Sequence, residues 1–317
     1  MTHTRPSVRE APTGASRGRA APRRSRTSRR TDALAGYLFV APQVLGVLVF
    51  VIVPVGLAMW YSLNEWNVFT GDLDFVGGDN YTAALNDPQL PGVLGATALF
   101  SGGVVVFNIA LGLALAVMLN RRFRGVALFR TLFFSPVVVS VVAWTLVWGF
   151  LLQDNGGVNG VLAMVGIDGP NWLQNGPTAM ASVTFTQVVR SVGINMVLFL
   201  AALQGVPKEL YEAARVDGAS SRRIFTGITL PLISPTLLLT AIITIVGALQ
   251  SFAQIAVLTG GGPGLSTTVL VFYVFQQTFG FNDIGYGSTL ALMLLTFVML
   301  LTVVQWQLRR KWVTYED

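Results

Sequence analysis

Cysteine is absent from the 317-residue sequence, and histidine occurs once, as His3. Without cysteine the chain can form neither a disulfide nor a thiolate metal site. Because the one histidine lies next to the N-terminus, histidine catalysis and histidine metal ligation are excluded from the rest of the chain. A membrane-embedded serine protease with a Ser–His pair is excluded on the same ground.

Charged residues are also scarce. They make up 11% of the chain against 53% hydrophobic residues, and the mean hydropathy is +0.62. Ordinary soluble domains carry roughly a quarter charged residues, and a chain of this size buries only part of its surface on folding. The composition therefore excludes a soluble globular enzyme and predicts an all-α polytopic membrane protein.

Lysine occurs only at Lys208 and Lys311, and neither stands in a G-x4-G-K-[ST] phosphate loop. The chain therefore cannot bind and hydrolyse ATP by that route. The spans predicted below also supply no His, Cys, Asp or Glu, which an embedded metal or nucleophile site would need.

Arginine is concentrated at the N-terminus, where residues 1–30 contain nine of them among Ser, Thr, Pro and Ala. We predict that 1–32 is a disordered cytoplasmic arm attracted to anionic lipid, and that it does not bind nucleic acid. Arg29-Arg30 before an apolar run could belong to a twin-arginine export signal. However, the run from 33 to 60 exceeds a signal h-region of ~7–15 residues, and no small-residue cleavage site follows.

Six stretches are long and apolar enough to cross a bilayer, which takes about 20 residues per helix. They are continuous rather than alternating, which indicates helices and not barrel strands. The sequence thus predicts a six-helix transmembrane domain over 33–312 and a short tail over 313–317. The predicted spans are roughly 34–62, 94–119, 131–152, 179–204, 233–258 and 286–308.

All basic residues but one lie in the arm, in loops 120–130 and 205–232, or just after the last span. The other three loops, 63–93, 153–178 and 259–285, contain acidic residues and no basic ones. By the positive-inside rule, both termini and the two basic loops are predicted to be cytoplasmic, an N-in/C-in topology.

The remaining basic residue, Arg190, lies in the fourth predicted span, 17 positions before Pro207. At 1.5 Å per residue it is roughly 25 Å from the cytoplasmic turn, near or beyond the middle of the membrane. No Asp or Glu occurs in the predicted spans to pair with it. Arg190 either snorkels or pairs with backbone carbonyls, or it lines a polar pathway for a hydroxyl-rich or anionic substrate.

The fifth predicted span has one face of small or polar residues. Such residues commonly mediate helix packing, and a ligand contact is the alternative. The face consists of Thr244, Ala248 and Ser251 with Gly247 beside them, and Gln250 and Gln254 form an adjoining stripe.

Loop 205–232 predicts two short cytoplasmic helices. The first ends at Gly218, a C′ glycine, and the second runs from Ala219 to Ile228 and is stopped by Pro231. An amphipathic loop on the membrane surface is the plain alternative.

The same loop matches the spacing EAA-x3-G-x9-I-x-L-P at every position. It resembles the signature loop of the membrane subunits of binding-protein-dependent ABC importers. The surrounding stretch, LAALQGVPKELYEAARVDGAS, is similar to the sugar-permease branch, the relatives of the maltose and glycerol-phosphate permeases. The matching residues are Glu212, Ala213, Ala214, Gly218, Ile228, Leu230 and Pro231.

The resemblance extends over nearly the whole chain after the arm. FVGGDNYTAALNDP resembles the outer-loop "vGLdNY" element of the family, with Gly78 where Leu is commoner. LFRTLFFSPVVVS resembles the beginning of the third span, and VLTGGGPGLSTTVLVFYVF resembles the T-x-GGP-x-x-x-T element. The implied fold is the type I ABC importer permease fold.

The resemblance implies a role for the loop, which in the family docks into a cleft of the cytoplasmic ATPase. Glu212, Asp217 and Gly218 would form its core, and Gly218 would let the two short helices turn closely. The implied coupling residues are Glu212, Ala213, Ala214, Asp217, Gly218, Ala219, Ile228, Leu230 and Pro231.

Placing the chain on the maltose-type relative also implies a substrate pathway. The aromatic and Asn residues that hold maltose there are not matched, so a sugar is implied and maltose is not. The implied pathway residues are Arg190, Ser191 and Ile194 in the fourth span, and Thr244, Gly247, Ala248 and Ser251 in the fifth.

The implied protein is a multi-pass permease of the bacterial cytoplasmic membrane that does no covalent chemistry itself. Its implied partners are a cytoplasmic ABC ATPase dimer, which carries ATP and Mg, a second related permease and an extracytoplasmic solute-binding protein. A stand-alone secondary transporter is the main alternative, but it would need membrane carboxylates for ion coupling. A channel would not need the EAA loop, and an embedded enzyme lacks its reactive residues.

Overall fold

The computed structural model describes residues 26–66, 70–121 and 123–312. The chain forms two compact units, Met1–Val55 and Gly56–Asp317. Most of the predicted arm and the tail 313–317 lie outside the described residues. Helix α1 already begins at Arg26, so 26–32 are helical rather than disordered. Extending an existing helix by a few residues costs far less free energy than starting one, and arginine is a good helix former.

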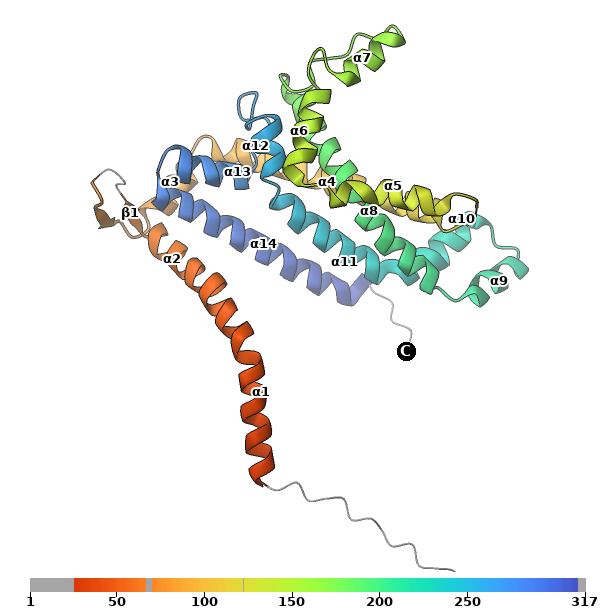
Figure 1. Ribbon diagram of the computed structural model, residues 1–317, viewed down its shortest axis with the longest axis horizontal. Coiled ribbons are helices and arrows are strands. Elements are labelled where there is room, and N and C mark those ends of the chain that lie inside the picture. The colour runs from red at the N-terminus through yellow and green to blue at the C-terminus, as the bar shows by residue number, and fades with distance from the viewer. Residues whose placement is uncertain (1–25, 67–69, 122, 313–317) are drawn as a thin grey trace, which may run out of the picture. The chain divides into compact units, whose positions relative to one another are not determined.

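The elements are almost all helical, apart from one short antiparallel hairpin (Figure 1). In chain order they are α1 (Arg26–Val47), the π-helical η1 (Leu48–Ile52), α2 (Val53–Ser62), β1 (Asn64–Trp66), β2 (Leu73–Phe75), α3 (Asp79–Asn86), α4 (Leu90–Leu119), α5 (Val126–Val138), α6 (Val141–Leu151), α7 (Gly157–Met164), α8 (Gly176–Gly205), α9 (Lys208–Val216), α10 (Ser221–Ile224), η2 (Phe225–Thr229), α11 (Leu230–Leu249), α12 (Ala253–Leu258), α13 (Leu270–Phe275), η3 (Gln276–Gly280) and α14 (Ile284–Trp312).

Within the described residues, five helices are long and apolar enough to cross a membrane, and counting the bent pair α5–α6 as one span gives six. This confirms the predicted all-α fold with five continuous candidate spans, and the bent pair lies where the remaining span is predicted. The five continuous spans are Tyr37–Ser62, Leu90–Leu119, Gly176–Gly205, Ser221–Leu249 and Ile284–Gln307.

The third predicted span, 131–152, is not one straight helix. It divides into α5 and α6, which bend by 102° at Val139–Ser140. Pro136 has no N–H to donate to the Leu132 carbonyl, and the Ser135 hydroxyl donates to that carbonyl instead, at 3.0 Å. A proline inside a helix weakens the turn around it, and the chain leaves the helix three residues later.

The fifth predicted span, 233–258, is also wrong in its bounds. The continuous helical segment begins at Ser221 and ends at Leu249, and α12 follows after a break at Gln250–Phe252. The Ser251 hydroxyl donates to the Gly247 carbonyl at 3.2 Å. A serine bonded to a carbonyl four residues earlier competes with the backbone ladder, which is consistent with a break here.

Helix α8 lies at the centre of the Gly56–Asp317 unit, with α4 along one side and α5 and α11 also against it (Figure 1). A Cβ on Gly112 of α4 would lie 3.0 Å from the Asn195 Cβ, and one on Gly103 would lie 3.1 Å from the Thr184 Cγ2. These glycines let the two backbones approach closely, as small residues do between membrane helices. Gly193 has the same function against α5, since a methyl group there would overlap the Phe133 carbonyl.

The end of the bundle near α3 is tied to the end of the first span by side chains of the NY element. The Asn80 amide donates to the carbonyls of Ser62 and Asn64, at 3.0 and 3.1 Å. The Tyr81 hydroxyl lies 2.9 Å from the Ser62 hydroxyl. The family-like sequence element therefore closes the loop that contains the β1–β2 hairpin.

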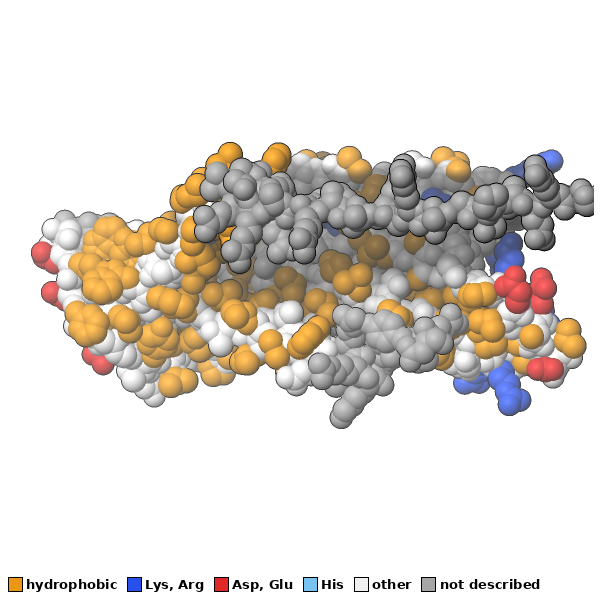
Figure 2. Space-filling model, turned by 90° about the horizontal axis from the view of Figure 1, so that it is seen from below, with side chains coloured by type: hydrophobic (Ala, Val, Ile, Leu, Met, Phe, Trp, Pro, Cys, Tyr) orange, Lys and Arg blue, Asp and Glu red, His pale blue; other side chains and the backbone are white. Residues whose placement is uncertain are grey.

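Basic side chains lie at one end of this unit. The carboxyl ends of α4 and α8 and the helices α9 and α10 lie at one end, and α3 and α13 lie at the other (Figure 1). On the face shown in Figure 2, the Lys and Arg side chains lie only at the α9 end. The basic loops counted from the sequence thus lie together at one end of the helices (Figure 1).

The α5–α8 contact predicts a sharp difference between two glycines. Gly193→Ala should destabilise the chain by roughly 1–3 kcal/mol, because the added methyl group forces α5 away from α8. Gly102→Ala is the matched control, because a Cβ at Gly102 of α4 would meet no atom within 4 Å. Thermal unfolding of the detergent-purified variants should show a lower Tm for Gly193→Ala alone, and equal Tm values would contradict the contact.

Candidate functional site

The turn after α9 has the predicted glycine geometry. Gly218 has φ +73°, its N–H donates to the Arg215 carbonyl at 3.1 Å, and the Ala219 N–H donates to the Ala214 carbonyl at 2.9 Å. This pair of bonds is a Schellman motif, and it confirms Gly218 as a C′ glycine. A Cβ at Gly218 would meet no atom within 4 Å. The glycine is therefore needed for its positive φ and not for a close approach of two helices.

The second helix does not stop at Pro231, contrary to the prediction. Ser220 caps α10, accepting a hydrogen bond from the Arg223 N–H at 3.4 Å, and the helix continues through η2 into α11. In η2 the Leu230 N–H bonds to the Phe225 carbonyl, five residues earlier. This wider π turn lies directly before Pro231, where it accommodates the ring and the missing N–H.

The coupling residues divide into an exposed group and a packed group. Glu212, Ala213, Asp217 and Gly218 are exposed, while Ala214, Ala219, Ile228, Leu230 and Pro231 are half-buried. Tyr211 anchors α9, with its hydroxyl 3.3 Å from the Thr229 hydroxyl and its ring against the α4–α8 core. The first group forms a surface at the tip of the bundle, and the second joins that surface to the fifth span.

Two pathway residues that are adjacent in sequence lie on different faces of α8. The Trp144 indole donates to the Thr186 carbonyl, and Gly193 meets α5. Arg190 comes between these two residues along α8, and since a helix turns about 100° per residue it lies on the side of α8 that meets α6 and α5. Ser191 instead meets α4: its hydroxyl lies 3.2 Å from the Asn108 Oδ1 and 2.7 Å from the Gln187 carbonyl of its own helix.

Arg190 is half-buried, and its guanidinium forms no hydrogen bond with any described residue. Ile194, one turn later, is 38% exposed. These two residues therefore belong to a face of α8 that the described chain leaves partly open.

The predicted face of the fifth span is mostly packed inside the chain. Thr244 accepts a hydrogen bond from the Asn195 amide at 3.1 Å, and Ala248 belongs to the core that includes Val188 of α8. Ser251 is buried as well, whereas Gly247 is exposed. Thr244, Ala248 and Ser251 mediate helix contact here, and their role toward a substrate stays a prediction.

The sequence pointed to Ser191, Thr244 and Gln254 but not to the buried polar side chains that they bond across the helices, Asn108, Asn195 and Gln187. The Gln254 amide of α12 donates to the Gln187 side chain of α8 at 2.5 Å, and the Asn195 amide donates to Thr244. Gln187, Ser191 and Asn195 are spaced four residues apart, so they form a polar stripe along an apolar helix. That four-residue spacing is the signal in the sequence that marks this stripe.

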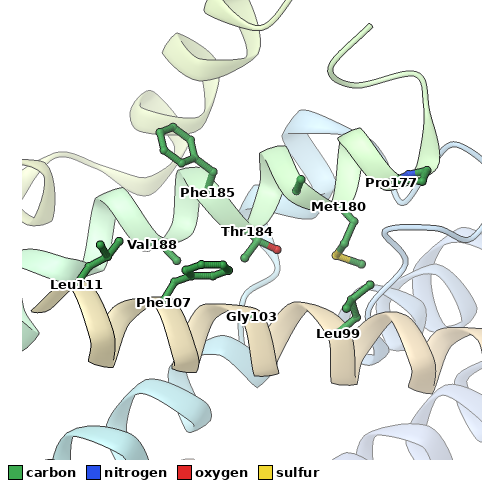
Figure 3. A pocket seen from close by; sticks show the side chains of 10 residues that line it. Leu99, Gly103, Phe107, Leu111, Pro177, Met180, Thr184, Phe185 and Val188 are labelled. Carbon is green, nitrogen blue, oxygen red and sulfur yellow. The ribbon is translucent and has the colours of Figure 1, made fainter. Parts of the chain in front are cut away.

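A groove of about 490 Å³ lies between α4 and α8 (Figure 3). Leu99, Phe107 and Leu111 of α4 face Met180 and Val188 of α8 across it, and Thr184 contributes a hydroxyl. A lining this apolar offers few hydrogen-bond partners for a sugar. The groove contains none of the predicted pathway residues.

Asp87, before α4, is the most strongly bonded carboxylate among the described residues. Its Oδ2 accepts hydrogen bonds from the hydroxyls of Tyr273 and Tyr286, each at 2.6 Å, and its Oδ1 accepts one from the Gln89 N–H at 2.8 Å. Burial raises the pKa of the Asp87 carboxyl, but these hydrogen bonds outweigh burial and hold the pKa below its usual 3.8. Burial, together with the bonded carboxylate, raises the pKa of Tyr273 to about 12.

No group of three or more His, Cys, Asp or Glu side chains that could hold a metal occurs in the described part of the chain. Three features could serve transport. One is the projecting loop that turns at Gly218, and another is the pair of broken spans that meet α8 near Thr186 and Gln187. The third is Arg190, which has no hydrogen-bond partner among the described residues and lies beside one of the breaks. Discontinuous helices of this kind line solute sites in transporters.

The family described as "Binding-protein-dependent transport system inner membrane component" matches residues 108–313. The chain belongs to this family. It is therefore a permease subunit of an ABC importer, a multi-pass protein of the cytoplasmic membrane and not an enzyme, and ATP hydrolysis belongs to a separate subunit.

Sequence relatives place this permease in the sugar branch. It is 35% identical over 272 residues to the trehalose/maltose transport system permease of Thermococcus litoralis, covering 86% of this chain and 91% of the relative. It is 34% identical to the arabinooligosaccharides transport system permease of Bacillus subtilis, covering 86% and 88%. It is 33% identical to the sn-glycerol-3-phosphate transport system permease of Yersinia pestis, covering 88% and 95%.

Solved structures share the fold. A chain of a bacterial ABC transporter that imports the acidic polysaccharide alginate has a TM-score of 0.77 at 23% identity, covering 90% of the permease and 98% of that chain. A chain of a methionine ABC transporter has a TM-score of 0.52 at 16% identity, covering 72% and 100%. At these identities the likeness shows the fold alone.

The Asp87 cluster predicts a stability change at alkaline pH. Because the folded chain holds the Tyr273 proton up to a pH of about 12 and an unfolded tyrosine releases it near 10, this contribution is complete below pH 10 and is lost as the pH rises to 12. Tyr273→Phe should lower the Tm at pH 7 by removing a buried hydrogen bond, worth about 1–3 kcal/mol, and should flatten the decline between pH 10 and 12.

Thermal unfolding between pH 7 and 12 measures both effects. Asp79→Asn, which changes an exposed carboxylate on α3, is the control and should keep the wild-type alkaline decline. An alkaline decline in Tyr273→Phe as steep as in the wild type would show that the cluster does not contribute.

Proposed function

We propose that this permease forms half of the translocation pathway for a sugar or sugar-like solute and couples to the ATPase through the α9–Gly218–α10 loop. The observation that carries the proposal is that loop: Glu212, Ala213, Asp217 and Gly218 are exposed on a glycine turn at one tip of the bundle. The trehalose/maltose, arabinooligosaccharide and glycerol-phosphate relatives support a sugar as the solute class.

The proposed assembly contains this permease, a second related permease, a cytoplasmic ATPase dimer with ATP and Mg, and an extracytoplasmic solute-binding protein. Both termini and the α9 end face the cytoplasm in this proposal, as the loop charges favour. The β1–β2, α3 and α13 end then faces the binding protein. The solved alginate importer, described in complex with a periplasmic protein, supports this arrangement.

Coupling would run from α9 into the bundle through defined contacts. Tyr211 bonds to Thr229 in η2, and η2 continues into α11 without a break. α11 in turn bonds to α8 through Thr244 and Asn195. Closure of the ATPase dimer would thus move α9, α11 and α8 together and rock the bundle between outward-open and inward-open states.

The solute would pass along the partly open face of α8. Arg190 and Ile194 are accessible there, and Gly247 is exposed on α11. Ser191, Thr244, Ala248 and Ser251 lie behind this face, where they hold α8 against its neighbours. The second permease would supply the opposite wall.

Co-purification tests the assembly. The tagged chain, expressed with its genomic neighbours, should bring down an ATPase with a phosphate loop and a second membrane chain with an EAA loop. A chain that purifies alone and moves solute in liposomes without ATP would overturn the proposal in favour of a secondary transporter.

Charge reversal at the loop tests coupling. Glu212→Lys should abolish uptake of the solute held by the binding protein, because it places a positive charge on the surface that meets the ATPase. Membrane insertion should be unchanged, since Glu212 is exposed and contacts no core residue. Glu209→Lys, on the same exposed helix, is the matched control and should retain most uptake. Normal transport by Glu212→Lys would refute the coupling assignment.

Removal of the Arg190 side chain tests whether the solute passes along this face of α8. Arg190→Ala should weaken the apparent affinity for the solute about tenfold or more, or change the substrate range, because a hydrogen bond from a charged donor is worth about 1.5–3 kcal/mol. Uptake kinetics normalised to the amount of protein in the membrane measure the effect. Ser191→Ala, a change at a packed position, is the comparison for effects on protein level alone. If Arg190→Ala also lowers only the amount of protein in the membrane, then Arg190 has a structural role.

A further inference from the structure

The turn between α4 and α5 is confined to the membrane surface. α4 ends at Leu119 and is a candidate span, and α5, which begins at Val126, is the first half of the bent α5–α6 pair. A six-residue connection can extend only about 10 Å beyond the helix ends, since half of it must return. We therefore expect the side chains of Arg121, Phe123 and Arg124 at the level of the lipid headgroups.

This turn presents arginines that the chain itself does not neutralise. Arg121 and Arg124 are exposed, and neither forms a hydrogen bond or ion pair with a described residue. Arg130, on the second turn of α5, folds back so that its Nη2 donates to the Leu119 carbonyl at 2.8 Å. A cation at the carboxyl end of a helix is favourable, and this bond fixes the start of α5 against the end of α4.

Apolar side chains accompany the arginines. Phe123 and Phe129 are 43% and 47% exposed, and their ring centroids lie 6.1 Å apart. Leu128 and Leu132 on α5 are 62% and 57% exposed. Aromatic rings beside cations at a span end are typical of membrane-interface anchors.

We propose that this turn is a binding site for an anionic phospholipid. Arg121 and Arg124 bind the headgroup phosphate, Phe123 and Phe129 lie at the glycerol level, and the acyl chains lie along Leu128 and Leu132. Arg130 is the positioning residue, because it holds the turn to α4. Charge complementarity selects the lipid, and the adjoining exposed leucines distinguish a lipid from a free phosphate ion.

Native mass spectrometry of the full-length chain, with whatever subunits co-purify in a mild detergent, tests the site. The probes are phosphatidylglycerol and phosphatidylcholine with identical acyl chains, and inorganic phosphate as a competitor. Phosphatidylglycerol should stay bound at concentrations where phosphatidylcholine does not, and inorganic phosphate should not displace it. The double variant Arg121→Gln/Arg124→Gln should weaken phosphatidylglycerol binding by about fivefold per arginine, roughly 25-fold in all.

Arg222→Gln/Arg223→Gln is the matched control for net charge, because it removes two exposed arginines from α10 and should leave the affinity for phosphatidylglycerol unchanged even if it weakens coupling through the α9–Gly218–α10 loop. Equal losses in both double variants would show attraction to net charge rather than a site, and would overturn the proposal. It would also be overturned by equal retention of the two lipids, or by displacement with inorganic phosphate. Loss of a co-purifying subunit from Arg121→Gln/Arg124→Gln with lipid binding intact would identify a protein contact instead.

Discussion

The close contact between α4 and α8 is the constraint on which the rest of the bundle depends. Lipid is as apolar as leucine, so burying leucines gives membrane helices little reason to associate, and close packing and polar pairs must hold them together. Gly103 and Gly112 supply the close packing, and the bond from Ser191 to Asn108 supplies a polar pair in the same interface. With α8 held in this way, its other faces are available to the two broken spans.

Both broken spans contact α8 at neighbouring residues, so the two breaks lie close to one another along α8. The Trp144 indole of α6 bonds to the Thr186 carbonyl, and Gln254 of α12 bonds to the Gln187 side chain. Both bonds are donated by side chains a few residues after the breaks, so each span resumes its helix in contact with α8, close to Arg190.

The span count, the glycine turn at Gly218 and the family could be predicted because each depends on local sequence or on a short pattern. The breaks in the third and fifth spans could not, because Pro136 and Ser251 are of types that straight membrane helices also tolerate. The predicted helix end at Pro231 was wrong because proline commonly ends a helix, whereas here the π turn before it keeps the helix continuous. Which face of α8 carries Arg190 and which carries Ser191 depends on neighbours far away in the sequence.

That continuity through Pro231 decides how a movement at the tip can reach the middle of the membrane. If the helix ended at Pro231, α9 and α10 would be joined to the fifth span only by loop residues. A displacement of α9 would then change the loop conformation and would not reach the fifth span. Instead the segment from Ser221 to Leu249 is one helix, with Tyr211 joined to its first turns and Asn195 joined to Thr244 near its far end. A rigid element with fixed contacts at both ends transmits displacement, and its far end is where the chain breaks beside α8.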